Sequence, residues 1–166
     1  MIEIIQDMQK KQKELDVAIM KNQGITYKDV SLEQYYYAIL DEIGELNHEL
    51  KYDWCWWKKT QTEVDKEKVL QELVDVWFFT LSVGNKLQIE YSEEIEYGYD
   101  TLPIYLDKLH RLLIDKNPNL SKVYDYVMLV DNLKNISIKT GFTMQEVYQG
   151  YMEKLKINYE RIENNY

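Results

Sequence analysis

Two pairs of acidic residues have the side-chain types and the spacing to bind a metal ion together. Glu42 and Glu45 are three residues apart, as are Glu72 and Asp75, and each pair lies in an apolar stretch with a helical pattern. Residues three apart on a helix are surface neighbours, with about 5–6 Å between their Cβ atoms. Two such helices packed face to face would gather four carboxylates, which require a positive charge between them. Oxygen ligands of this kind suit Mg²⁺, and the cluster predicts chemistry on a phosphorylated substrate.

The helical phase supports this interpretation. On the helix expected over about residues 66–89, apolar residues cover most of the circumference, which is typical of a buried helix. Glu72 and Asp75 fall between its apolar faces, so water alone cannot easily satisfy them. One alternative stays open, namely that these two acids pair with Lys or Arg residues across the helical bundle.

A polar stripe near the end of the sequence supplies the residue types that hold phosphate. Lys154, Asn158 and Arg161 lie at positions i, i+4 and i+7 of one expected helix, beside Tyr151. Lys and Arg bind phosphate oxygens, and an Asn amide suits a base edge or a sugar hydroxyl. The alternative is a solvated helix face whose cations complement the helix dipole.

Two further positions are candidates for contacts with a nucleobase. Gln12 and Asp16 are i, i+4 neighbours, and a Gln amide can read the edge of a base such as uracil, although such a pair often only faces solvent. Trp57 adjoins Lys58 in a Trp-rich connection and could stack on a base. The sequence holds no His or Cys spacing that would support a His-based site or a nucleophilic enzyme.

Composition limits the class of protein. The 166 residues predict one domain over 1–166, and only six Gly and two Pro favour long helices over a many-stranded sheet. A net charge of −9 argues against direct binding to nucleic acid or to an anionic membrane surface. A single Cys, no signal-peptide pattern and no apolar run of about 18–20 residues predict a soluble, cytoplasmic protein.

The periodicity predicts an all-α bundle of about six helices. Ser31 with Gln34, and Thr143 with Glu146, are capping-box signals at two helix starts. Pro103 is expected to break or reset the fourth helix. The expected helices span about residues 2–22, 31–52, 66–89, 92–115, 121–139 and 143–163.

Taken in order, five segments make the sequence resemble a known family. The family is that of the dimeric all-α dUTP pyrophosphatases found in bacteriophages, some bacteria and trypanosomatid parasites, within the MazG-like all-α NTP pyrophosphatase superfamily. The phage-type members are the most similar in length and ending. The segments are Gln12–Asp16, Glu42–Leu46, Trp57–Lys58, Glu72–Phe79, and Lys154–Arg161 with Tyr166 beyond.

The resemblance implies a function and a set of site residues. It implies Mg²⁺-dependent hydrolysis of dUTP to dUMP and pyrophosphate, which limits uracil entry into DNA, by a homodimer. Two or three Mg²⁺ ions, with Mn²⁺ as a possible substitute, would be bound by the four acids, and Glu45 would be the general base. The implied substrate-binding residues are Gln12, Asp16, Trp57, Lys58, Lys154, Asn158, Arg161 and Tyr166.

Some positions depart from the family pattern, and two other functions stay open. The longer members have His, Asn and Gln where this chain has Phe78, Leu155 and Ile162. The alternatives are a house-cleaning pyrophosphatase of the same superfamily with another nucleotide preference, and a non-enzymatic helical interaction protein whose acids form salt bridges. Residues 91–140 carry no transferable motif and could serve dimerisation or a partner.

Overall fold

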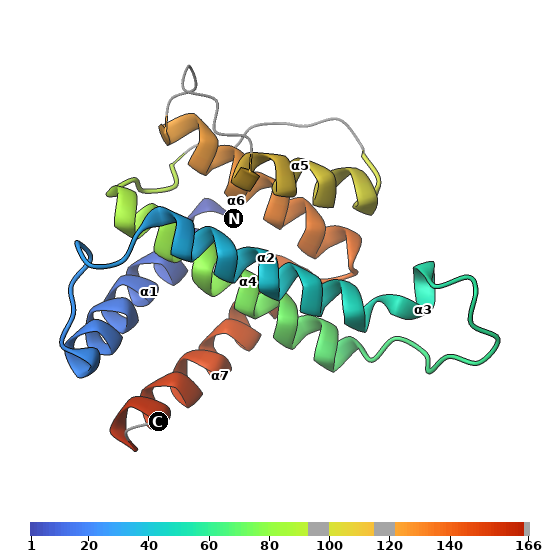
Figure 1. Cartoon of the computed structure of the whole chain (residues 1–166), viewed down its shortest axis with the longest axis horizontal. Coiled ribbons are helices and arrows are strands. Elements are labelled where there is room, and N and C mark those ends of the chain that lie inside the picture. The colour runs from blue at the N-terminus through green and yellow to red at the C-terminus, as the bar shows by residue number, and fades with distance from the viewer. Residues whose placement is uncertain (93–99, 115–121, 165–166) are drawn as a thin grey trace.

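The computed structural model describes residues 1–92, 100–114 and 122–164, and their regular structure is helical (Figure 1). No strand occurs among these residues, so the predicted all-α class is confirmed. Six long helices correspond to the six predicted ones, and α3 is an additional helical turn of four residues. The helices are α1 (Ile2–Gln23), α2 (Leu32–Glu49), α3 (Lys51–Trp54), α4 (Lys66–Leu87), α5 (Leu102–Ile114), α6 (Lys122–Lys139) and α7 (Met144–Glu163).

Side-chain caps start three of these helices. Both predicted capping boxes are present, with Ser31 and Thr143 each accepting from the backbone of the third helical residue and receiving the reciprocal bond. Asp65, which the sequence analysis did not single out, caps α4 by accepting from two backbone N–H groups. These bonds satisfy N–H groups that lack partners inside a helix.

The prediction of a helix over 92–115 was wrong at its start. The helix begins only at Leu102, with Pro103 in its first turn, where a missing N–H costs nothing. After α4 the chain turns at Gln88, which has a left-handed φ of 59°. The Gln9 side chain on α1 then donates to the Ile89 carbonyl (2.6 Å) and accepts from the Tyr91 N–H (3.1 Å). These side-chain bonds replace helical ones. Residues 93–99, and residue 121 at the expected start of the next helix, lie outside the described residues.

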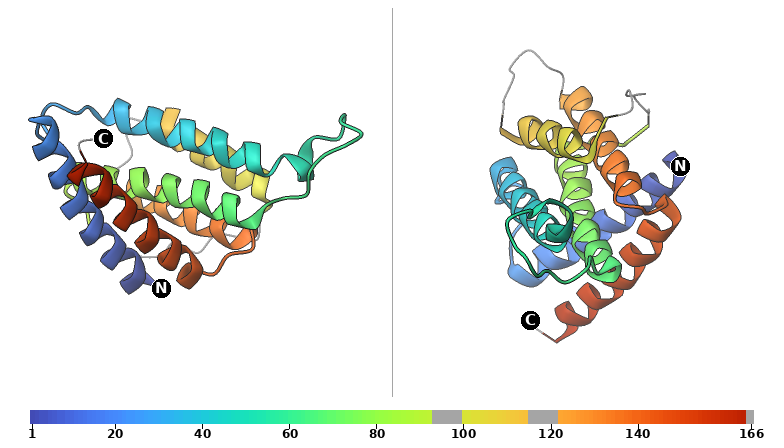
Figure 2. Two further views of the ribbon diagram at one scale, coloured as in Figure 1. Left: turned by 90° about the horizontal axis from the view of Figure 1, so that it is seen from below. Right: turned by 90° about the vertical axis from the view of Figure 1, so that its right-hand side faces the viewer.

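Helix α4 lies at the centre of the bundle. It packs against α1, α2, α6 and α7, with α5 and α6 above it in Figure 1 and α1 and α7 below. The two further views agree that α1 and α7 run side by side (Figure 2). An apolar stripe of α2 is buried at Ile39, Ile43 and Leu46, and α2 packs against α4. This contact aligns the two helices that carry the acidic pairs.

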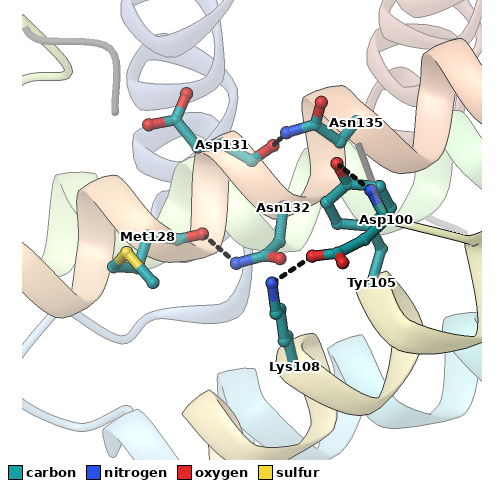
Figure 3. A network of polar contacts seen from close by, with 7 residues as sticks. All are labelled: Asp100, Tyr105, Lys108, Met128, Asp131, Asn132 and Asn135. Atoms are coloured by element: carbon teal, nitrogen blue, oxygen red, sulfur yellow. Dashed lines mark hydrogen bonds and ion pairs between the residues drawn. The ribbon is translucent and has the colours of Figure 1, made fainter. Parts of the chain in front are cut away.

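Helices α5 and α6 form a hairpin with its own polar contacts (Figure 3). Lys108 on α5 pairs with Asp100 at 2.5 Å. The fully buried Asp131 on α6 accepts from the Tyr91 hydroxyl at 2.7 Å and from the Lys134 ammonium at 2.9 Å. Because Tyr91 follows α4, this carboxylate joins α6 to the end of the central helix.

The close packing of α4 gives a stability prediction at two glycines. A Cβ at Gly84 would lie 2.3 Å from Tyr126 Cζ on α6 and 2.6 Å from Gln9 Nε2 on α1. We expect Gly84→Ala to lower the free energy of unfolding by about 1–3 kcal/mol, because buried neighbours must move. Gly44 on α2 is exposed with open space around it, so Gly44→Ala should be neutral or stabilising by up to about 1 kcal/mol. Urea denaturation measures both, and equal effects would contradict the prediction.

Candidate active site

Three of the four predicted metal ligands converge at the α2–α4 contact. Glu42 and Glu45 on α2 and Glu72 on α4 each offer a carboxylate oxygen, and these oxygens all lie within 4.8 Å of one another. Glu42 and Glu72 are half-buried and Glu45 is exposed. The apolar stripe of α2 faces α4, so the acids that border it are held at the edge of the contact. The apolar contact therefore shields one side of the cluster from water, and the other side is open to solvent.

Asp75, the fourth predicted ligand, is paired with a cation. Lys154 Nζ on α7 lies 2.6 Å from Asp75 Oδ2, and both side chains are mostly buried. The alternative of pairing across the bundle therefore holds for Asp75 in this structure. Lys154 favours the charged forms of Glu42 and Glu72 as well, although those two remain surrounded mainly by negative charge.

The cluster carries an electrostatic cost. Burial, and after it the nearby negative charges, raises the pKa of Glu42 from its ordinary 4.5 to about 7. Burial and the charges of Glu45 and Asp75 also raise the pKa of Glu72. A group of carboxylates that resists ionisation is stabilised by a cation among its oxygens, and an all-oxygen donor set suits Mg²⁺. The residues present therefore fit a divalent metal ion.

A cavity of about 460 Å³ opens beside the acids, between α1, α2, α4 and α7. This volume is in the range of small-molecule pockets in proteins. Seven predicted site residues line it, although they come from four separate helices: Gln12, Asp16, Glu42, Asp75, Lys154, Asn158 and Arg161.

Gln12 and Asp16 are buried, so the interpretation of a merely solvent-facing pair was wrong. The Gln12 amide donates to Asp16 Oδ1 at 2.8 Å, and the Tyr151 hydroxyl donates to the Gln12 carbonyl at 3.0 Å. Phe78 stacks on Tyr151 with 4.4 Å between ring centroids. The pocket thus places the polar pair of Gln12 and Asp16 next to the aromatic ring of Phe78.

Two residues that touch Asp16 carried no weight in the sequence analysis, and of these Ser82 lines the cavity whereas Tyr27 lies behind Asp16 and does not line it. Ser82 on α4 donates to Asp16 at 2.8 Å, and Tyr27, in the connection after α1, donates to it at 3.0 Å. Ser82 lies in the apolar run of α4, where a hydroxyl needs a partner, and that signal could have identified it. The position of Tyr27 carried no such signal.

The polar stripe of α7 faces the pocket along its length. Lys154 and Asn158 are half-buried, while Arg161 is exposed and its Nη1 lies 3.4 Å from Asn158 Oδ1. All three line the cavity, so the stripe is more than a solvated face. Tyr166, also predicted to bind substrate, lies outside the described residues.

Trp57 and Lys58 do not line this pocket. They belong to the connection between α3 and α4, which extends beyond the end of the bundle (Figures 1 and 2). Trp57 is 58% exposed and contacts the rings of Trp54 and Trp56 rather than the cavity. One chain by itself therefore does not bring this predicted pair to the site.

Comparison with known proteins agrees with this geometry. The family model described as dUTPase matches residues 4–166. The chain belongs to the dUTPase family. Membership makes it an enzyme, a dUTP diphosphatase that hydrolyses dUTP to dUMP and pyrophosphate. A comparison with curated proteins found no match.

Family membership decides between the functions that the sequence left open. Four acids without a facing cation would have excluded a non-enzymatic helical interaction protein, and Lys154 does face Asp75. The match over nearly the whole chain nevertheless assigns this dUTPase a catalytic function on a nucleotide. Among the described residues, no helix combines the length and apolarity that a membrane span requires.

The raised pKa of Glu42 gives a prediction on metal binding. Below about pH 7 the metal-free dUTPase should hold a proton on Glu42, which Mg²⁺ must displace. Mg²⁺ binding should therefore release a proton and weaken as the pH falls through 7. Calorimetric titration in two buffers of different ionisation enthalpy counts the released proton. Glu42→Gln should abolish the release, whereas Asp41→Asn, at an exposed neighbour, should retain it.

The raised pKa of Glu42 also predicts how the stability of the metal-free protein changes with pH. Because the folded-state pKa of Glu42 lies above its unfolded value, the metal-free fold binds more protons than the unfolded chain between about pH 4.5 and 7. The contribution of this group to stability therefore decreases as the pH rises through that range. A Glu42→Gln variant with the wild-type pH dependence of unfolding would contradict the assignment.

Proposed function

We propose that the acids at the α2–α4 contact bind Mg²⁺, that the adjoining cavity holds the deoxyuridine moiety, and that α7 binds the phosphates. The observation that carries this proposal is that the acidic cluster and the cavity share a residue, Glu42. Glu42 and Asp75 line the cavity, and Glu42 also belongs to the cluster with Glu45 and Glu72. A nucleotide in the cavity would therefore extend its phosphates towards the acids.

The metal site follows from the oxygen donors. Glu42, Glu45 and Glu72 hold the ions, and Asp75 joins them as the fourth ligand. Two or three Mg²⁺ ions fit four carboxylates, and Mn²⁺ substitutes because it accepts the same ligands. The ions would neutralise phosphate charge, acidify a water molecule and orient an in-line displacement.

Helix α7 supplies the cations that a protein of net charge −9 needs in order to hold a triphosphate. Within the chain itself Lys154 pairs with Asp75. With dUTP bound, Lys154 turns to a phosphate oxygen and Asp75 becomes free to bind metal. Arg161 reaches the phosphates from the exposed end of the stripe, and Asn158 contacts the sugar between them.

Proton transfer is assigned to Glu45. It is the exposed member of the cluster, so water reaches it while its partners are half-buried. A carboxylate with one oxygen not used for ligation can orient water and accept its proton. Attack at the α-phosphorus then releases dUMP and pyrophosphate.

The test of the metal site is removal of one carboxylate charge. Glu72→Gln keeps the size of the side chain but removes a ligand, so Mg²⁺-dependent release of pyrophosphate from dUTP should fall by at least about a hundredfold. Helical circular dichroism should be unchanged. Glu67→Gln, on the first turn of the same helix and outside the cluster, serves as the matched control. Turnover by Glu72→Gln at the wild-type rate would rule out the metal site.

The oligomeric state is part of the same proposal. The chain acts as a homodimer in which residues 1–166 form one domain, whose buried side chains from α1 to α7 belong to one cluster. Trp56 and Trp57 are 87% and 58% exposed, and exposed aromatic surface of this kind marks interfaces. Sedimentation at micromolar concentration should give about twice the chain mass of 20.1 kDa. A single species of the chain mass would contradict the dimer.

A further inference from the structure

The floor of the cavity contains a chain of hydrogen bonds centred on Asp16. Its Oδ1 atom accepts from Gln12 Nε2 and from Ser82 Oγ, each at 2.8 Å, and its Oδ2 atom accepts from the Tyr27 hydroxyl at 3.0 Å. The three donors come from α1, from α4 and from the connection after α1. Asp16 is 7% exposed, and its carboxylate is the common acceptor for all three.

Each bond to the Asp16 carboxylate has only one favourable direction. A carboxylate accepts and does not donate, so Gln12 must turn its NH₂ group towards Asp16. The Gln12 carbonyl then faces the Tyr151 hydroxyl at 3.0 Å, whose single proton is shared between this carbonyl and the Met8 backbone carbonyl at 3.1 Å. Rotating the amide by 180° would put its oxygen against the Asp16 carboxylate, where two acceptors repel each other.

The direction of this amide matters for the choice of base. Uracil presents an N3–H donor beside the O4 acceptor, whereas cytosine presents an N4 amino donor beside the N3 acceptor. A primary amide has a donor and an acceptor side by side and, if free to rotate, can pair with either edge. After its bonds to Asp16 and Tyr151, Gln12 still has one N–H and one carbonyl lone pair to offer. An amide held in one orientation can match only one of the two edges.

We propose that Tyr27 and Ser82 are positioning residues for base selection, which hold the Asp16 carboxylate and, through it, the Gln12 amide in the orientation that pairs with uracil. This inference rests on the proposed function, in which the cavity holds the base. Neither residue needs to touch the base. They act by fixing the position of the Asp16 carboxylate and by keeping it a hydrogen-bond acceptor.

The two donors also offset the cost of burying a charge. Burial raises the pKa of Asp16, and the hydrogen bonds from Gln12, Ser82 and Tyr27 lower it. Without these donors a protonated Asp16 could donate to the Gln12 carbonyl, and the flipped amide would then be tolerated. Tyr27 is itself held in place, because the Lys86 ammonium donates to its backbone carbonyl.

The experiment measures selectivity rather than rate alone. The readout is the ratio of kcat/KM for dUTP to kcat/KM for dCTP in the full-length enzyme with Mg²⁺. Ser82→Ala and Tyr27→Phe should each lower this ratio by about two- to tenfold, the worth of one hydrogen bond. Ser82→Thr keeps the hydroxyl and should retain the wild-type ratio. A substitution that only destabilises the fold lowers both rates and leaves their ratio unchanged.

Matched controls exist for both residues. Tyr148→Phe removes a hydroxyl that donates to a different α1 aspartate, Asp7, at 2.7 Å and outside the cavity. Ser137→Ala removes a buried hydroxyl that accepts from Trp77 at 3.1 Å. Both controls should keep the wild-type ratio even if they lower stability. A fall in the ratio as large in the controls as in Ser82→Ala would overturn the inference.

Gln12→Ala separates failure of this inference from failure of the proposed function. Loss of the amide should lower the ratio by at least about tenfold, because the base then loses its polar partner. If Gln12→Ala lowers the ratio while Ser82→Ala and Tyr27→Phe do not, the positioning role is wrong and the base pocket stands. If none of the three lowers it, the cavity does not select the base and both proposals fail.

Discussion

Negative charge at the edge of an apolar helix contact is the constraint on which the rest of the structure depends. The stripe of Ile39, Ile43 and Leu46 must face α4 to be buried, and this contact holds Glu42 near Glu72 whatever their mutual repulsion. Burial at this contact, and after it the neighbouring negative charges, raises the pKa of both Glu42 and Glu72. Hydrophobic packing thus provides the free energy that assembles an unfavourable cluster of carboxylates, whose repulsion a bound cation would offset.

Helix α7 brings a positive charge to these acids from the other side of the cavity. It approaches α4 closely at Gly150, where an added Cβ would lie 3.2 Å from the Val74 side chain. Tyr151 follows, fully buried and stacked on Phe78. These contacts fix the helix so that Lys154 reaches Asp75 at 2.6 Å. The same helix therefore forms one wall of the pocket, neutralises one acid and lines the cavity with Lys154, Asn158 and Arg161.

The two ends of the cavity have different electrostatic designs. At the acidic end, the carboxylates of Glu42, Glu45 and Glu72 face one another, and the Asp75–Lys154 pair lies beside them. At the floor, the single carboxylate of Asp16 is surrounded by hydroxyl and amide donors, which satisfies it without a metal ion. A dUTPase has to hold both a highly charged triphosphate and a neutral base, and this division of polar groups serves both. The hairpin of α5 and α6, with its own buried Asp131, supports the bundle from the opposite side of α4.

The sequence by itself determined the all-α class, the helices that carry the acids and seven of the residues that line the pocket. These follow from local rules, since a 3.6-residue period, a capping box and an i, i+3 acid pair are visible within one turn or two. Tertiary structure alone decided that Asp75 pairs with Lys154, that Tyr27 and Ser82 hold Asp16, and that Trp57 lies away from the cavity. It also decided how the chain leaves α4, because the side chain of Gln9, 80 residues earlier, donates to the backbone carbonyl of Ile89. Such contacts join residues distant in sequence, and local periodicity carries no record of which distant partner a side chain meets.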